Sequence, residues 1–336
     1  MSLRGILART RTELLSPSPL DDTSLLGAGR AALILLPKDP QTCLRLAYQQ
    51  LHAVPYREVK TCWRRLYTDA ALWIVLEVVA EHLQKQTEEE DSDEKWVDRV
   101  VKELDMALIL TGAVAREDLV GEWFEALEAF LSSQAPERPA KRRKFANQLP
   151  ETFPDGIRRK PVLKFPIPRS RDLSLSAFQA KVSNPETQTP LIIERAIDHW
   201  PAFDDDRAWK NPAYLMRKTL NGRRLVPVEI GRSYTDAGWA QKILSFADFM
   251  HTYMLTPDPP SNSNFHSSAN PPDSEQQNST PGVNTPQKGY LAQHDLFAQI
   301  PPSALTSPPR LLLHRPATPL SNPSHIKPVD TLDDPC

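Results

Sequence analysis

The chain has 336 residues, enough for one or two domains, and 40% of them are apolar and 24% charged, as in globular proteins. A net charge of −2 gives the whole molecule no strong attraction to nucleic acid or anionic membranes. No apolar run is long enough to cross a bilayer and the first residues do not resemble a signal peptide, so the sequence predicts a soluble protein. The three cysteines, Cys43, Cys62 and Cys336, lack CxxC spacing; they indicate neither a zinc site nor a disulfide framework and fit a reducing compartment.

Residues 25–133 are predicted to form a helical domain. Apolar side chains recur there at helical spacing in four stripes, which are interrupted by Pro55 and by an acidic connector at Glu88–Glu94. Several amphipathic helices with short connectors are typical of a small helical domain. We interpret the stripes as its hydrophobic core; they begin at Leu44, Val59, Trp96 and Trp123.

Residues 134–160 are predicted to be a basic linker. It contains four consecutive basic side chains, Lys141, Arg142, Arg143 and Lys144, shortly after two prolines. A basic run in a flexible stretch is typical of a nuclear import signal, and it is equally typical of a solvated linker. Both interpretations stay open on the sequence.

After the linker the sequence changes to short strands mixed with helices, so the predicted fold class of the whole chain is α+β. Pro190 opens a β-type run that ends at Glu194, because proline suits the first position of a strand. Residues 225–230 alternate apolar with other residues and are predicted to be an edge strand, where Pro227 is tolerated. Helices are predicted at 209–219 and 246–254, and a further strand at 289–294.

Proline decides the expectation for the last quarter of the chain. About half of the 33 prolines follow Thr256, and proline removes backbone donors that helices and sheets need. Residues 256–288, rich in Pro, Ser and Asn, are therefore predicted to be a disordered insertion, and residues 302–336 a disordered tail.

Three motifs in a fixed order carry a family resemblance. They are Pro190–Ala196 with Asp198–Ala202; Val226–Gly231 followed by Tyr234, Asp236 and Trp239; and Gly289–His294 followed by Gln299, Ile300 and Pro301. Together with Trp63 and Tyr67 of the helical region, they resemble the JmjC family of cupin-like oxygenases, of the lysine demethylase or arginyl hydroxylase type. The resemblance runs from about Cys43 to Pro301, and the insertion at 256–288 departs from it.

Members of the family are built on a double-stranded β-helix that holds Fe(II) through a His-x-Asp/Glu pair and a distant second His. The resemblance implies that residues 161–301 are the incomplete N-terminal part of such a domain. It implies 2-oxoglutarate as co-substrate, whose decarboxylation drives hydroxylation of a C–H bond in a protein substrate, possibly a histone or another nuclear protein. It suggests Tyr234 as a residue of the 2-oxoglutarate pocket. The expected location is nuclear or cytoplasmic, with the nucleus favoured.

The iron ligands themselves are missing from the pattern. None of the eight histidines is followed two positions later by Asp or Glu. The near miss, His294-Asp295, places neighbouring side chains on opposite faces of a strand, and the resemblance puts His294 ahead of the iron-binding strand. After Pro301 the sequence no longer follows the family. We therefore expect a chain truncated before the iron site, an incomplete β-helix and no activity as written, and we attribute this to a shifted reading frame or a retained intron.

Two other readings compete with the oxygenase. One is a non-catalytic nuclear interaction protein that binds partners through the helical domain. The other is a product that does not fold stably, because strands such as Leu191–Glu194 lack sheet partners and leave exposed edges. Direct binding to nucleic acid or to a membrane is not indicated, since basic residues cluster only at 141–144 and no zinc or helix-turn-helix signature occurs.

Overall fold

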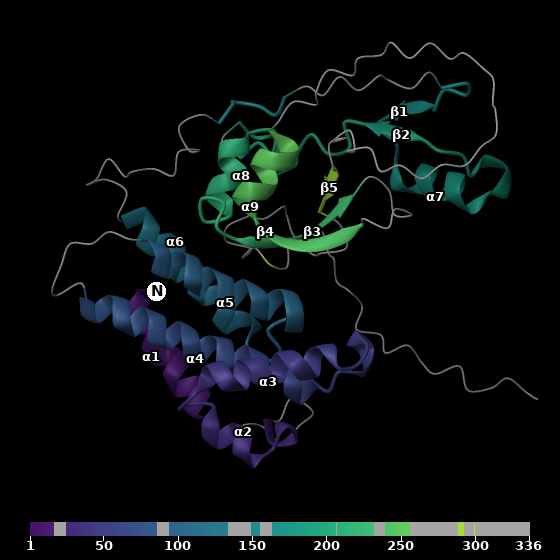
Figure 1. Ribbon diagram of the computed structural model, residues 1–336. Helices are drawn as coiled ribbons and strands as arrows, with labels where there is room; N and C mark the ends of the chain where they lie inside the picture. Colours follow the sequence, from purple (N-terminus) through teal and green to yellow (C-terminus); the bar gives the residue numbers. More distant parts are fainter. Residues whose placement is uncertain are drawn as a thin grey trace, which may run out of the picture.

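The computed structural model describes residues 1–16, 25–85, 94–133, 149–154, 163–205, 207–231, 239–255, 288–291 and 299. The described residues form mixed helix and sheet. Helices α1–α6 gather at one end of the molecule, and α7–α9 lie with two small sheets at the other (Figure 1). We call the described residues up to Ser133 the helical part, and those from 163 onward the strand part.

The helical part is organised around α4 (Thr61–Lys85), which packs against α1, α3 and α5. Buried side chains surround α4, so it runs through the middle of the bundle. The helices predicted within 25–133 are present, and the bundle also includes α1, which that range leaves out. The other helices are α1 (Leu3–Leu15), α2 (Arg30–Leu35), α3 (Pro40–His52), α5 (Lys95–Thr111) and α6 (Glu117–Ser133), with 3-10 turns at Leu25–Ala28 and Tyr56–Glu58.

Local sequence signals set the ends of these helices. α3 begins after Asp39, whose carboxylate accepts the N–H of Thr42 at 3.0 Å, and Pro40 occupies its first turn. α5 ends at Gly112, which adopts φ +69° and donates its N–H to the last carbonyls of the helix.

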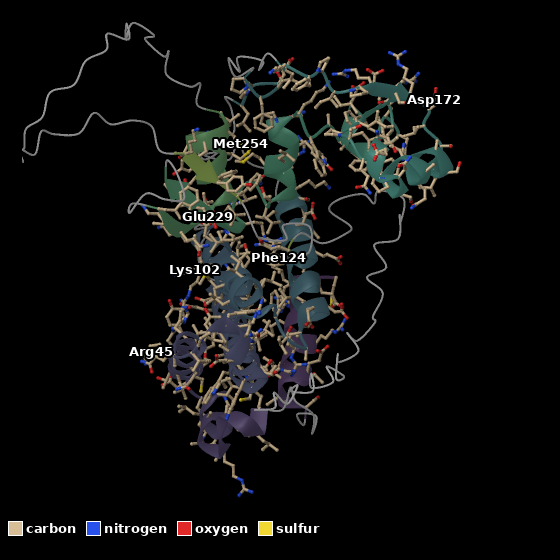
Figure 2. All side chains as sticks on the ribbon, turned by 90° about the vertical axis from the view of Figure 1, so that its right-hand side faces the viewer. Arg45, Lys102, Phe124, Asp172, Glu229 and Met254 are labelled. Carbon is tan, nitrogen blue, oxygen red and sulfur yellow. The ribbon has the colours of Figure 1, made fainter. Side chains whose placement is uncertain are left out.

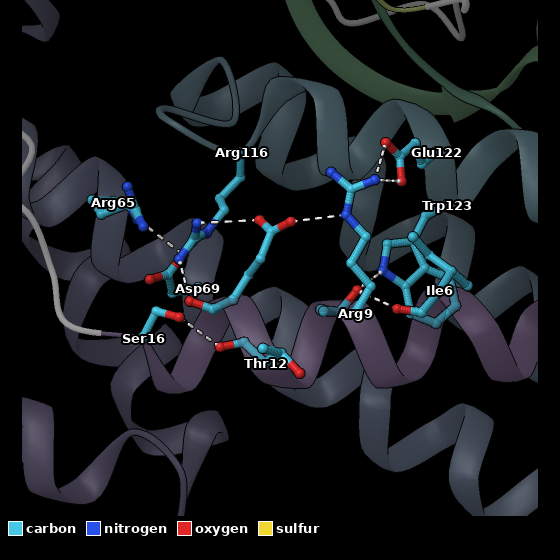
Figure 3. Close-up of polar contacts among 11 residues, drawn as sticks. Ile6, Arg9, Thr12, Ser16, Arg65, Asp69, Arg116, Glu122 and Trp123 are labelled. Atoms are coloured by element: carbon cyan, nitrogen blue, oxygen red, sulfur yellow. Dashed lines mark hydrogen bonds and ion pairs between the residues drawn. The ribbon is translucent and has the colours of Figure 1, made fainter.

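Polar contacts attach α1 to the bundle (Figure 3). The indole N–H of Trp123 on α6 donates to the Thr10 hydroxyl at 2.9 Å, and that hydroxyl donates to the carbonyl of Ile6 at 2.8 Å. Nearby, the fully buried Asp69 accepts from Arg65 at 3.0 Å and from Arg116 at 3.1 Å. Because each buried polar group has a partner, these contacts fix the register of α1 against α4 and α6.

Arginine–carboxylate pairs extend this network toward the surface. Arg116 also donates to the carbonyl of Glu13 at 3.1 Å. Arg9 pairs with Glu13 at 2.9 Å along α1 and with Glu122 of α6 at 2.5 Å. The outer pairs are partly exposed and each contributes little to stability, whereas the inner pair at Asp69 is shielded from water.

The strand part contains two separate sheets. A parallel pair joins β1 (Arg169–Arg171) to β2 (Ile192–Glu194), and a three-stranded antiparallel sheet has the order β4-β3-β5. The predicted run at 190–194 thus has a partner strand, contrary to the expectation that it lacks one. The elements are β1, α7 (Leu175–Ser183), β2, α8 (Pro212–Lys218), β3 (Leu225–Gly231), β4 (Ala240–Ser245), α9 (Phe246–Phe249), a π-helical turn at Met250–Met254 and β5 (Lys288–Tyr290), with 3-10 turns at Pro185–Thr187 and Pro201–Phe203.

β3 is the central strand of its sheet, so the prediction of an edge strand was wrong. Its ladder with β5 begins at Glu229, two residues beyond Pro227, where no missing proline donor disturbs it. Val226, Val228 and Ile230 point to one face and pack with α8, α9 and the π-helical turn in a second core. A helix is present within the predicted range 209–219, where α8 begins only at Pro212 and is capped by Asn211. The predicted helix at 246–254 is present as α9 and the π-helical turn.

The segment that carries β1, β2 and α7 stands apart from both cores. None of the described residues from 163 to 205 is buried. Large apolar side chains are exposed on it, including Phe165 at 78% and Leu175 at 82%. The predicted disordered insertion and tail lie outside the described residues, apart from Lys288, which belongs to β5. No helix among the described residues is long and apolar enough to span a membrane.

Replacing Thr10 with Val is expected to lower the free energy of unfolding by about 1–3 kcal/mol, because the buried indole N–H of Trp123 loses its acceptor. Thr12→Val is the matched control on the same helix: its hydroxyl is exposed and bonds only to Ala8, so its effect is expected to stay within about 0.5 kcal/mol. Urea unfolding followed by circular dichroism measures both. Equal effects of the two variants contradict this role for Thr10.

Acid is expected to destabilise the helical part through His82. The His82 ring stacks on Trp96 with centroids 4.2 Å apart, and burial lowers the pKa of His82. A folded-state pKa below the unfolded value of about 6.5 means that His82 stabilises the fold above that pH and that this stability is lost as the pH falls. Thermal unfolding at pH 7.5 and pH 5 checks this. His82→Phe keeps an aromatic ring, and its melting temperature is expected to fall less between the two pH values; an unchanged pH response refutes the assignment.

Candidate functional site

A polar row crosses the face of the three-stranded sheet opposite its apolar core. Glu229 on β3 lies directly across from Gln241 on β4 and from Tyr290 on β5, and opposed residues share a face. Glu229 is only 7% exposed and lies near the boundary with the helical part (Figure 2). One carboxylate oxygen, Oε1, accepts the Gln241 amide at 3.3 Å, while Oε2 is buried without a hydrogen-bond partner. Glu229 was not singled out as a site residue from the sequence. Alternation along the strand places it on the same face as Pro227, two residues earlier.

Two glycines of the family motifs allow aromatic rings to approach the ends of β3 and β5. A Cβ on Gly231 would come within 2.5 Å of the Trp239 ring, and a Cβ on Gly289 within 2.5 Å of the Tyr253 ring. Contacts this close leave no room for a side chain. The lack of a side chain at Gly231 and Gly289 therefore permits the rings of Trp239 and Tyr253 to pack at the ends of these strands.

The β1–β2 pair carries a second polar group. Glu194 accepts from Arg171 at 2.7 Å and from Arg169 at 3.1 Å. The hydrogen bond from Arg171, followed by that from Arg169, lowers the pKa of the Glu194 carboxyl. Both arginines are exposed, so solvent screens this cluster.

The described residues do not fit an iron site. Among them, no three His, Cys, Asp or Glu side chains gather in a way that could hold a metal ion. His199 is exposed beside Trp200, and His251 lies partly buried in the π-helical turn. Cys43 and Cys62 are buried free thiols in the helical part.

The residues predicted from the sequence to be functional fall outside the described residues. These are Tyr234 and the basic run Lys141, Arg142, Arg143 and Lys144. Their roles stay predictions. His294, which the sequence did not favour as an iron ligand, also lies outside the described residues. Gln299, the first residue of the last motif segment, is described and is buried against β3 and α5.

Comparison with known proteins gives consistent relatives. The chain is 26% identical to lysine-specific demethylase 8 of Danio rerio over 263 residues, which are 78% of this chain and 54% of that protein. It is 26% identical to lysine-specific demethylase JMJ30 of Arabidopsis thaliana over 277 residues, 76% of this chain and 53% of the relative. It is 32% identical to Jumonji C domain-containing protein 5 of Drosophila melanogaster over 135 residues, 40% of this chain and 26% of the relative. No family model and no solved structure matches the chain.

The chain spans about half the length of the first two of these relatives. An alignment of 263 residues is longer than either part alone, so it includes residues of both the helical and the strand part. The agreement of these relatives with the three ordered motifs confirms the family resemblance. The chain is similar in sequence to JmjC-domain proteins, among them lysine-specific demethylase 8 and Jumonji C domain-containing protein 5.

Proposed function

We propose that the chain provides the helical part and the first strands of a JmjC-type protein oxygenase that depends on Fe(II) and 2-oxoglutarate. The observation that carries the proposal is the collinear match of both parts to lysine-specific demethylase 8 and JMJ30. In this proposal residues 161–301 are the beginning of a double-stranded β-helix of the cupin type. The helical domain at 25–133, the basic linker at 134–160, the insertion at 256–288 and the tail at 302–336 complete the proposed organisation.

The proposed substrate is a protein side chain. The relatives' names specify lysine demethylation, which favours a methylated lysine in a histone or another nuclear protein; an arginyl side chain is the other candidate. Hydroxylation of an N-methyl group yields formaldehyde and the demethylated amine, whereas hydroxylation of a side-chain carbon leaves an alcohol. In this proposal Lys141, Arg142, Arg143 and Lys144 direct nuclear import, and Tyr234 contacts 2-oxoglutarate.

The 336 residues are proposed to lack the iron site, because no His-x-Asp/Glu sequence occurs among them. Sequencing the full transcript across the codons for Gln299 to Cys336 tests the assignment. A frame that continues into a His-x-Asp/Glu strand and a later His supports the oxygenase. A transcript that reads through to Cys336 in the given frame favours the alternative, a non-catalytic nuclear protein that acts through its helical part. That alternative requires a folded helical part, and α1–α6 share an extensive core.

The purified 336-residue chain is expected to show no saturable one-to-one binding of Fe(II) with 2-oxoglutarate, because three converging ligands are required. Anaerobic calorimetry measures the binding, and assay of succinate measures turnover. His294→Ala serves as the matched variant: one-to-one binding that this variant abolishes would contradict the prediction and make His294 an iron ligand.

A further inference from the structure

The helical part and the strand part meet at a fully buried ion pair. Asp105 on α5 is 0% exposed and Arg224, just before β3, is 1% exposed. The Arg224 guanidinium donates two hydrogen bonds to Oδ1 of Asp105, from Nε at 2.9 Å and from a terminal nitrogen at 2.8 Å. The same guanidinium lies 3.5 Å above the ring of Phe124 on α6. A buried charge of this kind is stable only while its partner stays in place.

Asp105 also organises the backbone around β3. Its Oδ2 accepts the N–H of Leu225 at 2.7 Å, which is the first residue of the strand. The amide of Gln299 donates to Asp105 Oδ1 at 2.6 Å and to the carbonyl of Leu225 at 2.8 Å. The carbonyl of Gln299 in turn accepts from Arg224 at 2.7 Å. One carboxylate of the helical part thus joins two segments of the strand part that are far apart in sequence.

The turn ahead of β3 is strained. Leu220, Asn221 and Gly222 have φ values of +52°, +57° and +80°, three consecutive residues in the left-handed region. Each non-glycine residue there carries an energy penalty and persists only when its surroundings hold it. No residue with a side chain fits at position 222, because a Cβ there would lie 2.6 Å from the Cβ of Ala247.

The helical part holds both sides of this turn. The Leu220 side chain is buried within the core of the helical part. After the turn, Arg223 pairs with Asp98 at 3.1 Å and with Glu94, so both consecutive arginines bind acidic side chains at or near α5. The core of the helical part, in contrast, has its own internal ion pair at Asp69, whose partners Arg65 and Arg116 both belong to the helical part.

We propose that α5 is an internal clamp: its acidic side chains, Asp105 above all, hold residues 220–225 in the strained geometry from which β3 starts. The partner of this acidic surface is the strand part of the same chain, so this side of the helical part is not a free surface for other proteins. Release of the clamp frees β3 and its neighbours while the bundle stays folded. This inference stands on the contacts above and does not depend on the proposed oxygenase activity.

Hydrogen exchange of the full chain, read by mass spectrometry, tests the clamp with two matched variants. Asp105→Asn removes the charge that crosses between the parts, and Asp69→Asn removes the equally buried charge within the bundle. In Asp105→Asn the amides of β3 and β4 are expected to exchange at least tenfold faster, with those of α4 changed less than twofold. In Asp69→Asn the amides of α1 and α4 are expected to change at least as much as those of β3.

Two results overturn the proposal: β3 protection in Asp105→Asn equal to that of the unaltered chain, or loss of protection by the same factor in β3 and α4. The second result would mean general destabilisation without a clamp. If Asp105→Asn yields no folded protein, exchange in β3 and α4 is compared in Arg224→Lys instead. This variant keeps the positive charge but loses the two hydrogen bonds that the guanidinium donates to Asp105. A selective loss of β3 protection in that variant supports the clamp, and an unselective or absent loss refutes it.

Discussion

The buried pair of Asp105 and Arg224 is the constraint on which the arrangement of the two parts depends. Removing a carboxylate and a guanidinium from water is unfavourable, and their attraction offsets this only with good geometry and further hydrogen bonds. Here Leu225, Gln299 and the Phe124 ring supply those further contacts. The pair and its hydrogen bonds therefore add a directional constraint on the position of α5 against β3, which non-directional apolar packing does not supply.

The same logic recurs inside the helical part on a smaller scale. Asp69 joins Arg65 of its own helix to Arg116, and Trp123 bonds Thr10 on α1. The apolar core supplies most of the stabilisation, and these polar contacts decide which helix faces which. Asp69 thus connects elements within the helical bundle, whereas Asp105 connects the bundle to the segment that leads into β3.

The relation to JmjC-domain proteins gives this architecture a context. The match to lysine-specific demethylase 8 includes both parts, and the clamp physically connects the same two parts. Gln299, a residue of the last motif, and Leu225, the residue directly ahead of the motif on β3, both donate hydrogen bonds to Asp105. Motifs that suggested a family thus also serve a structural purpose, which is to attach the first strands of the sheet to the helical part.

Local sequence patterns predicted the helices α3–α6, the strands at 192–194 and 225–231, and the resemblance to JmjC-domain proteins. Helical and strand periodicity and short motifs depend only on neighbouring residues, so the sequence alone reveals them. The tertiary structure decided the rest. It made β3 a central strand, since β5 arrives from residues far along the chain, and it added α1 to the bundle. It also paired Asp105 with Arg224 across 119 positions, because one aspartate on an amphipathic helix looks like any solvated charge until the segment that covers it is in place.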